Sequence, residues 1–357
     1  MDNSGQITAP GRLESGAVIA PDAPKVPDQN LAELAWAHGL KLAGARPTLS
    51  AYILSLWQRR HFILGYATAR NVSMYTDAKL GQLWQILTPL LNAGVYFLIF
   101  GILFGARDGI TNYTAVLMAG VFTFAFTERS VVTGSNVMRA NLQLVRALYF
   151  PRASLPLAYV IVELQQMLVG MGVLAVIMLA THESISWYWL LLIPAVLLQT
   201  TCNIGVALAV ARLGGSTADA SELIPFFLRI TRYFCGVMYV AITLTGRLHH
   251  TWEKLILTLN PPAVFISLVR VAFMQTYRTQ SAGNKPYNAQ FCKLFMSDMG
   301  GKNVPGRPGM VNNALQAYCH PIVTNNDLWI AALAWGIGCF VIGIVFFWKA
   351  EHLYGRG

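Results

Sequence analysis

The sequence predicts an all-α membrane protein that crosses the bilayer with six helices. The first observation is composition: 55% of the residues are hydrophobic and only 12% are charged, whereas soluble proteins average about 25% charged residues. The second is the stretch Leu83–Phe104, which carries no charge and can cross a hydrocarbon core of about 30 Å as a helix. The third is that comparable apolar stretches recur as far as Leu328–Trp348.

Residues 1–49 are predicted to form a cytosolic extension. Its first thirty residues contain four prolines and few large apolar side chains, a composition typical of disorder. Asn30 followed by Glu33 resembles a capping box, which predicts a short helix over Leu31–Leu42. The extension lacks a basic start followed by an apolar core, so no signal peptide is expected.

Residues 50–82 are predicted to form an amphipathic interface helix that begins at Ser50. At about 100° per residue, one face of this helix is apolar; it consists of Ile53, Leu56, Trp57, Ile63, Leu64 and Ala67. Arg59 and Arg70 share another face, a pattern typical of a helix in the headgroup layer. Arg60 falls within the apolar face, so it either snorkels or contacts an anion.

Residues 83–348 are predicted to hold the transmembrane domain. Its spans are Leu83–Phe104, Tyr113–Gly134, Leu157–Thr181, Trp187–Ala211, Leu223–Leu244 and Leu328–Trp348. Glu128 and Arg129 lie near the end of the second span. The stretch Ser135–Pro156 is too charged to cross and predicts a short cytosolic helix, and Arg212–Glu222 predicts a polar turn.

Two further apolar segments, Leu255–Leu259 and Ala263–Met274, are too short to span alone. Pro261 and Pro262 separate them, which predicts a re-entrant helix pair before the last span. Arg and Lys concentrate in the segments that the positive-inside rule assigns to the cytosol. Both termini are therefore expected to be cytosolic, with residues 246–327 as an outer loop and 349–357 as a cytosolic tail.

The outer loop contains Cys292 and Cys319, in a compartment where disulfides persist, so these two are predicted to pair. His249, His250 and Glu253 have a spacing compatible with a metal ion, but a fourth ligand is missing nearby. No metal site is therefore expected.

The chemistry of an enzyme is not evident in this sequence. No G-x-x-x-x-G-K-[ST] phosphate loop occurs, so the chain is not expected to hydrolyse ATP. A membrane-embedded glycosyl- or acyltransferase would require a catalytic acid–base or nucleotide-sugar site, and none is found. A secondary transporter would require internal repeats and a proton-coupled carboxylate, for which only Glu163 qualifies.

Charged residues inside spans usually face a water-filled path or a partner. Glu163, Arg229 and Arg232 are therefore candidates for a substrate path, with a structural ion pair between the third and fifth spans as the alternative. Aromatic residues recur near the membrane, and the candidates among them are Tyr96, Phe122, Phe126 and Tyr233. Such rings either stack against sugars or pack as an aromatic belt.

Three groups of residues resemble ABC-2 type permeases that export polysaccharides. The first group, before and within the first span, is Arg70-Asn71-Val72 with Tyr75, Leu80-Gly81-x-x-Trp84 and Pro89. The second group, before the third span, is Phe150-Pro151-Arg152 with Leu155-Pro156-Leu157-Ala158. The third group, before the last span, is Asn260-Pro261-Pro262 with Arg270. They occur in the family's order.

This resemblance implies a homodimer of six-span subunits in the bacterial plasma membrane, bound to two copies of a separate ABC ATPase. ATP and Mg would bind that partner, and this chain would need no cofactor. The substrate would be a polyprenyl-pyrophosphate-linked glycan; the extended N-terminus and the Cys-bearing loop resemble the actinobacterial cell-wall galactan exporters of this family. The ATPase would contact the interface helix and the loop residues Arg139, Arg146, Phe150 and Arg152.

The sequence departs from the family pattern between Arg70 and Tyr75 and just beyond, where relatives tend to carry several basic residues. Here the run Val72–Asp77 contains none. If relatives hold a lipid pyrophosphate there, the candidates for that role in this chain are Arg59, Arg60, Arg70 and Lys79.

Overall fold

The computed structural model describes residues 48–103, 113–147, 150–180, 186–237, 251–273 and 325–350. All of them belong to one compact unit, residues 46–357. The described residues form helices and connecting turns without a strand, which confirms the all-α prediction. The predicted helix Leu31–Leu42, the cysteines Cys292 and Cys319 and the histidines His249 and His250 lie outside the described residues.

Four of the described helices are long and apolar enough to cross a membrane. They are α5 (Tyr113–Ala140), α7 (Ser154–Ala180), α8 (Leu192–Ser216) with the 3₁₀ turn η3 (Trp187–Leu191) before it, and α16 (Asn325–Ala350). They correspond to the second, third, fourth and last predicted spans. Apolar stretches of this length with few charges form helices in a bilayer because a helix satisfies its own backbone hydrogen bonds.

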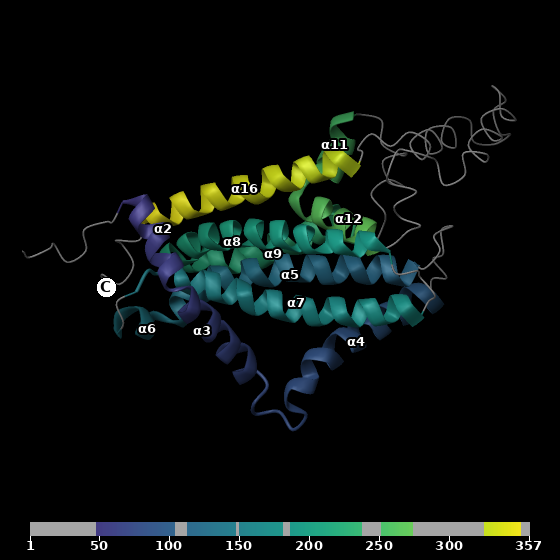
Figure 1. The fold of residues 1–357 in the computed structure, drawn as a ribbon, viewed down its shortest axis with the longest axis horizontal. Helices are drawn as coiled ribbons and strands as arrows, with labels where there is room; N and C mark the ends of the chain where they lie inside the picture. The colour runs from purple at the N-terminus through teal and green to yellow at the C-terminus, as the bar shows by residue number, and fades with distance from the viewer. Residues whose placement is uncertain are drawn as a thin grey trace, which may run out of the picture. The chain divides into compact units, whose positions relative to one another are not determined.

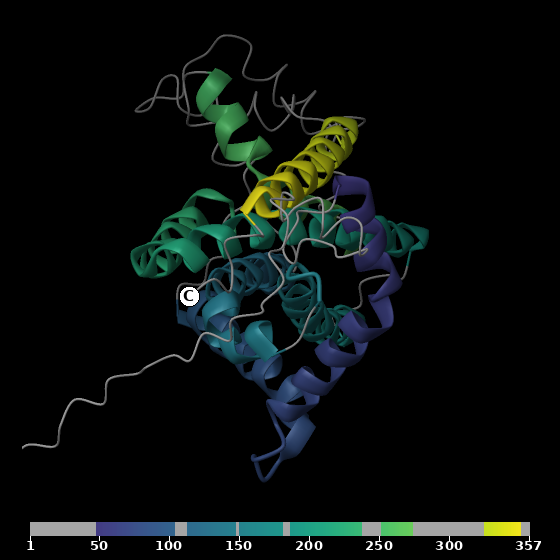
Figure 2. The same cartoon turned by 90° about the vertical axis from the view of Figure 1, so that its left-hand side faces the viewer.

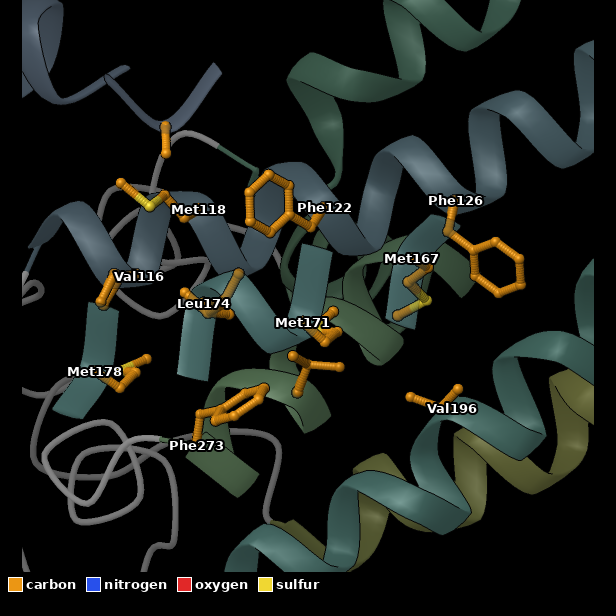
Figure 3. Close-up of a cluster of buried hydrophobic side chains, with 14 of the residues drawn as sticks. Val116, Met118, Phe122, Phe126, Met167, Met171, Leu174, Met178, Val196 and Phe273 are labelled. Carbon is orange, nitrogen blue, oxygen red and sulfur yellow. The ribbon is translucent and has the colours of Figure 1, made fainter. Parts of the chain in front are cut away.

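These long helices pack side by side, with α8 between α5 and α16, and α7 against α5 (Figure 1). The largest buried cluster lies between α5 and α7, where Phe122, Met171 and Leu174 pack together (Figure 3). Phe273 joins this cluster from α12 (Pro261–Phe273). Because lipid is as apolar as these side chains, close packing rather than burial from water holds such helices together.

The first predicted span is a helix whose winding changes along its length. A 3₁₀ turn, η1 (Gly81–Leu83), leads into α4 (Trp84–Tyr96), and the π-helical segment η2 (Phe97–Leu103) follows directly. Gly81 has a φ of 51°, which favours glycine, so the chain turns sharply just before α4. Neither α4 nor η2 is long enough alone to be among the four long apolar helices.

The fifth predicted span is a shorter helix that starts earlier than expected. The helix α9 runs over Ala218–Phe234, and the described chain leaves it through Gly236, whose φ is 72°. The predicted polar turn Arg212–Glu222 is wrong, because α8 continues to Ser216 and only Thr217 is extended between the two helices. Arg212 stays helical because its guanidinium lies 3.9 Å from the Phe346 ring centroid and donates to the Phe346 carbonyl at 2.6 Å.

The predicted interface helix is divided into α2 (Leu49–Gln58) and α3 (Arg60–Ser73), so its continuity was predicted wrongly. Its apolar surface also divides into two stripes. Tyr52, Leu56, Ile63 and Ala67 are buried, whereas Ile53, Trp57 and Leu64 are 44%, 67% and 49% exposed. At 100° per residue the exposed stripe lies about a quarter turn from the buried one. One stripe therefore packs on the protein and the other faces outwards.

The remaining short helices agree with the sequence. The helix α6 (Leu142–Ala147) occupies the predicted loop, and α11 (Thr251–Leu259) with α12 forms the predicted pair before the last span. The helix α12 is buried from Ala263 to Phe273 and packs against α5, α8 and α16. The elements α2, α3 and α6 lie at one end of the helix bundle, which faces the viewer in Figure 2.

Candidate functional site

A cavity of about 290 Å³ lies between α4, α5 and α7. It is lined by Tyr75, Gln85, Thr88, Pro89, Asn92, Val121, Phe122, Ala125, Glu128, Arg129, Gln166, Met167 and Gly170. Each helix contributes one face, because the lining positions recur at three- or four-residue intervals. Polar groups from all three helices therefore meet at this cavity, among apolar side chains.

Two ion pairs border this cavity. The Arg129 Nε atom lies 3.5 Å from Glu163 Oε2, and Arg129 Nη1 donates to Gln166 Oε1 at 2.8 Å. Arg232 of α9 pairs with Glu128 through its Nη2 atom. The predicted alternative, an ion pair between the third and fifth spans, is wrong in its partners. Both Glu163 and Arg232 are instead paired with consecutive residues of α5.

Glu128 and Arg129 were not among the predicted site residues, although they are the charged residues that line the cavity. The signal was present in the sequence as an adjacent Glu–Arg pair inside an apolar stretch. The boundary predicted at Gly134 made the two look like end residues, whereas α5 continues to Ala140. The pair therefore lies well inside a long apolar helix.

The aromatic candidates occupy different environments. Phe122 lines the cavity, whereas Phe126 is fully buried in the cluster of Figure 3 and serves packing. Tyr96 is partly buried on α4, and Tyr233 is 62% exposed on α9. Arg229 is also exposed on α9, close in sequence to Tyr233. The structure thus brings one of the four predicted rings to the cavity.

A chain of polar side chains connects α3 to the cavity wall. Gln165 of α7 donates to Thr68 Oγ1 at 3.2 Å and accepts from Asn71 Nδ2 at 3.0 Å. Gln85 of α4 donates to Asn71 Oδ1 at 3.3 Å. Gln166, the neighbour of Gln165, donates to the Met74 sulfur at 3.5 Å. The interface helix α3 is therefore hydrogen-bonded to both α4 and α7.

A second polar contact holds the other side of α3. Tyr66 donates to Asn141 Oδ1 at 3.2 Å, and Asn141 Nδ2 donates to the Tyr159 hydroxyl oxygen at 3.2 Å. Burial is the main cause that raises the pKa of Tyr66 above its ordinary value, followed by the neighbouring Tyr159. The Tyr66 phenol therefore keeps its proton at neutral pH and remains a hydrogen-bond donor. Asn141, between α5 and α6, ties α3 to α7.

The basic residues predicted for a lipid pyrophosphate are all exposed: Arg59, Arg60, Arg70 and Lys79. The Arg60 guanidinium lies 5.3 Å from the Trp57 ring centroid and donates to the Trp57 carbonyl at 3.3 Å. The Arg70 guanidinium lies 5.8 Å from the Tyr159 ring centroid. Both arginines thus have aromatic neighbours and keep an exposed guanidinium.

The residues predicted to contact an ATPase divide into two groups. Arg139 and Arg146 are exposed and Arg152 is partly buried. Phe150 is only 8% exposed and lies 5.9 Å from the Phe62 ring centroid, so it anchors the loop to α3. Tyr52 reinforces this anchor, because its hydroxyl oxygen accepts a hydrogen bond from the Ala153 amide at 3.1 Å.

Comparison with known proteins identifies the family. The model of the ABC-2 type transporter family matches residues 64–274, which include the cavity and α12. An O-antigen export system permease protein RfbA from Klebsiella pneumoniae is 28% identical over 203 residues, covering 56% of this chain and 75% of that protein. A protein of the same name from Myxococcus xanthus is 22% identical over 223 residues, covering 62% and 84%. Because the family match extends over more than half of the sequence, this chain belongs to the ABC-2 type transporter family, as a multi-pass and non-catalytic transmembrane permease.

Proposed function

We propose that this chain is the transmembrane permease subunit of an ATP-driven exporter of lipid-linked polysaccharide. The observation that carries the proposal is the family match over residues 64–274. It is supported by the names of the two relatives, both of which are O-antigen export permeases. ABC-2 permeases pair with ATPase subunits, and this sequence has no phosphate loop of its own.

The proposed subunit crosses the bacterial plasma membrane six times. Its spans are α4 with η2, the four long helices, and α9. The pair α11–α12 re-enters the membrane from outside, and α2–α3 lies in the cytosolic headgroup layer. The outward stripe of Ile53, Trp57 and Leu64 supports this placement, because exposed apolar side chains suit the acyl boundary. Both termini are cytosolic in this topology, and residues 246–327 form the outer loop.

The proposed assembly is a homodimer of this chain with two copies of a separate ABC ATPase, which binds ATP and Mg. The ATPase contacts α2, α3 and the α6 loop, where Arg139, Arg146 and Arg152 contribute the basic surface and Phe150 holds the loop in place. Hydrogen bonds that join Asn71 and Thr68 to Gln165 of α7 support a transfer of movement from α3 into the bundle. Closure of the ATPases would open a path between two copies of α4 and α9.

The path itself is proposed to include the charged and aromatic residues around α5 and α9. Arg229 and Tyr233 are exposed on α9, and the cavity that Phe122 lines opens beside α4. Glu163 and Arg232 contribute through their ion pairs with α5. The lipid pyrophosphate is held near the cytosolic surface by Arg59, Arg60, Arg70 or Lys79, which are exposed.

Within the class of lipid-linked glycans, we propose actinobacterial cell-wall galactan as the polymer. The support is the long N-terminal extension and the Cys-bearing outer loop in the sequence.

Reconstitution tests the function directly. The purified chain in liposomes should neither hydrolyse ATP nor translocate lipid-linked glycan, and addition of the cognate ATPase should restore both activities. The glycan is followed by its accessibility to an externally added glycosidase. Export by the chain alone under a proton gradient would identify a secondary transporter and overturn the proposal.

A further inference from the structure

One face of α4 is polar in an otherwise apolar helix. Gln85, Thr88 and Asn92 follow one another at intervals of three and four residues, so they share the face that lines the cavity. Neither Thr88 nor Asn92 makes a side-chain hydrogen bond to another described residue, and both side chains are exposed. Polar groups at membrane depth are costly unless they face water or a ligand. This face is therefore suited to a polar occupant.

The charges around the cavity are balanced. Of the two charged residues that line it, Arg129 faces Glu163 at 3.5 Å and Glu128 pairs with Arg232. The four side chains carry no net formal charge. A phosphate or pyrophosphate is normally held by an excess of cationic donors, and the described lining offers no such excess. Amides that both donate and accept suit hydroxyl groups, which also do both.

The size and the remaining lining restrict the occupant further. A volume of about 290 Å³ lies just below the usual range of ligand pockets, roughly 300 to 1,000 Å³, so the cavity suits one small unit. Phe122, Val121 and Met167 supply apolar surface beside the polar face. A monosaccharide unit combines the same two features, since its C–H groups are apolar and its rim carries hydroxyls.

We propose that this cavity binds one uncharged sugar unit of the transported glycan. Asn92, Thr88 and Gln166 hydrogen-bond its hydroxyls, and Phe122 packs against its C–H groups. The inference rests on the proposed function, because it assumes that the substrate is a polysaccharide. It assigns the cavity to the neutral part of that substrate and leaves the lipid pyrophosphate to another surface.

Binding is tested with the full chain and its ATPase in nanodiscs. Saturation-transfer difference NMR follows methyl β-D-galactopyranoside and methyl α-D-mannopyranoside as neutral probes, and inorganic pyrophosphate as the anionic competitor. At least one glycoside should bind saturably, and pyrophosphate should not displace it. Asn92→Leu and Thr88→Val should each weaken that binding on the order of tenfold, the effect of one lost hydrogen bond. Gln58→Leu, on the exposed surface of α2, is the matched control and should leave binding unchanged.

Three outcomes would overturn the sugar site: no glycoside binding, displacement of the glycoside by pyrophosphate, or unchanged affinity in both Asn92→Leu and Thr88→Val. The thermal unfolding midpoint of each variant is measured as well, and a native midpoint shows that a weakened NMR signal does not result from unfolding. Thr88→Val also preserves the shape of the side chain. Export of lipid-linked glycan by the same preparation is measured in parallel. A complex that exports glycan without binding either glycoside contradicts the sugar site alone, whereas a complex that fails to export contradicts the proposed function.

Discussion

Gly343 of α16 lies against the main chain of Gly205 of α8, so that a Cβ atom on Gly343 would overlap the Gly205 carbonyl oxygen. A Cβ atom on Gly205 would in turn overlap the Cys339 carbonyl group. Membrane helices use such glycines to bring their backbones together and to increase dispersion contacts. The crossing therefore fixes α16 against α8, and these two helices form the most extensive contact in the described bundle.

Gly343→Ala should separate α16 from α8. Overpacking of a tight contact typically costs about 1–3 kcal/mol, which exceeds the gain in helix propensity from Gly to Ala, about 1 kcal/mol. The unfolding midpoint of the detergent-solubilised protein should therefore fall. Gly338→Ala is the control on the same helix, because nothing lies within 4 Å of a Cβ atom there, and its midpoint should stay level or rise. Equal midpoints for the two variants would refute the close crossing.

Arg270 joins three elements through backbone carbonyl groups. Its Nε donates to Val116 at 3.0 Å, and Nη1 and Nη2 donate to Gly236 and Val237 at 2.9 Å each. Only 1% of Arg270 is exposed. Arg270→Met removes three charge-assisted bonds and leaves buried acceptors, so we expect a loss of about 3–5 kcal/mol in unfolding free energy. Urea titration of near-UV circular dichroism measures it.

A matched substitution distinguishes the stabilising role of the Arg270 hydrogen bonds from a general effect of losing a positive charge. Arg229→Met removes an arginine from the exposed surface of α9, so its stability should stay within about 0.5 kcal/mol of the native value. Arg270→Lys should be intermediate, because one ammonium cannot reproduce the fork geometry. Native-like stability in Arg270→Met would show that the three carbonyl contacts contribute little.

The sequence predicted the long helices well because hydropathy reports directly on contact with lipid. The helices α7 and α16 begin and end within three residues of the predicted bounds. The turn expected at Arg212–Glu222 failed for a different reason. Arg212 is held by Phe346, which lies 134 residues further along the chain, and no local pattern reveals a contact of that range.

The sequence predicted two of the charged residues that border the cavity, but it did not predict the residues with which they pair. The rarity of charge in a span pointed to Glu163 and Arg232, and both border the cavity through their ion pairs. Their partners on α5 depend on helix packing and rotation, which hydropathy does not encode. The polar face that Asn92 contributes was missed because single amides in an apolar span carry a weak signal.

Arg60 provides a test of anion binding at the interface helix. Its guanidinium is exposed and lies over the Trp57 ring, so it can present its outer edge to a phosphate. Arg60→Lys keeps the charge and the ability to snorkel but loses the bidentate fork. We expect the export rate of the reconstituted complex to fall several-fold. Arg60→Met, which removes the charge together with the fork, should lower the export rate further. A native rate in Arg60→Lys would show that the side chain only snorkels.

Gln165 is expected to couple α3 to the cavity wall. Its amide bonds both Thr68 and Asn71, and Asn71 in turn bonds Gln85 of α4. Gln165→Leu removes two hydrogen bonds, each worth about 0.5–1.5 kcal/mol, while retaining a side chain of similar size. ATP hydrolysis by the assembled complex should stay near its native rate, and export should fall about tenfold, since 1.4 kcal/mol corresponds to a factor of ten.

The ratio of glycan exported to ATP hydrolysed is the informative measurement for Gln165→Leu. Loss of assembly would lower both rates together, whereas loss of coupling lowers only export. Gln82→Leu is the matched control, because Gln82 is exposed at the start of the α4 region and makes no side-chain hydrogen bond to another described residue. It should leave the ratio unchanged. A native ratio in Gln165→Leu would show that movement of α3 reaches the cavity wall by another route, through the apolar contacts of Ile63 and Ala67 with α7.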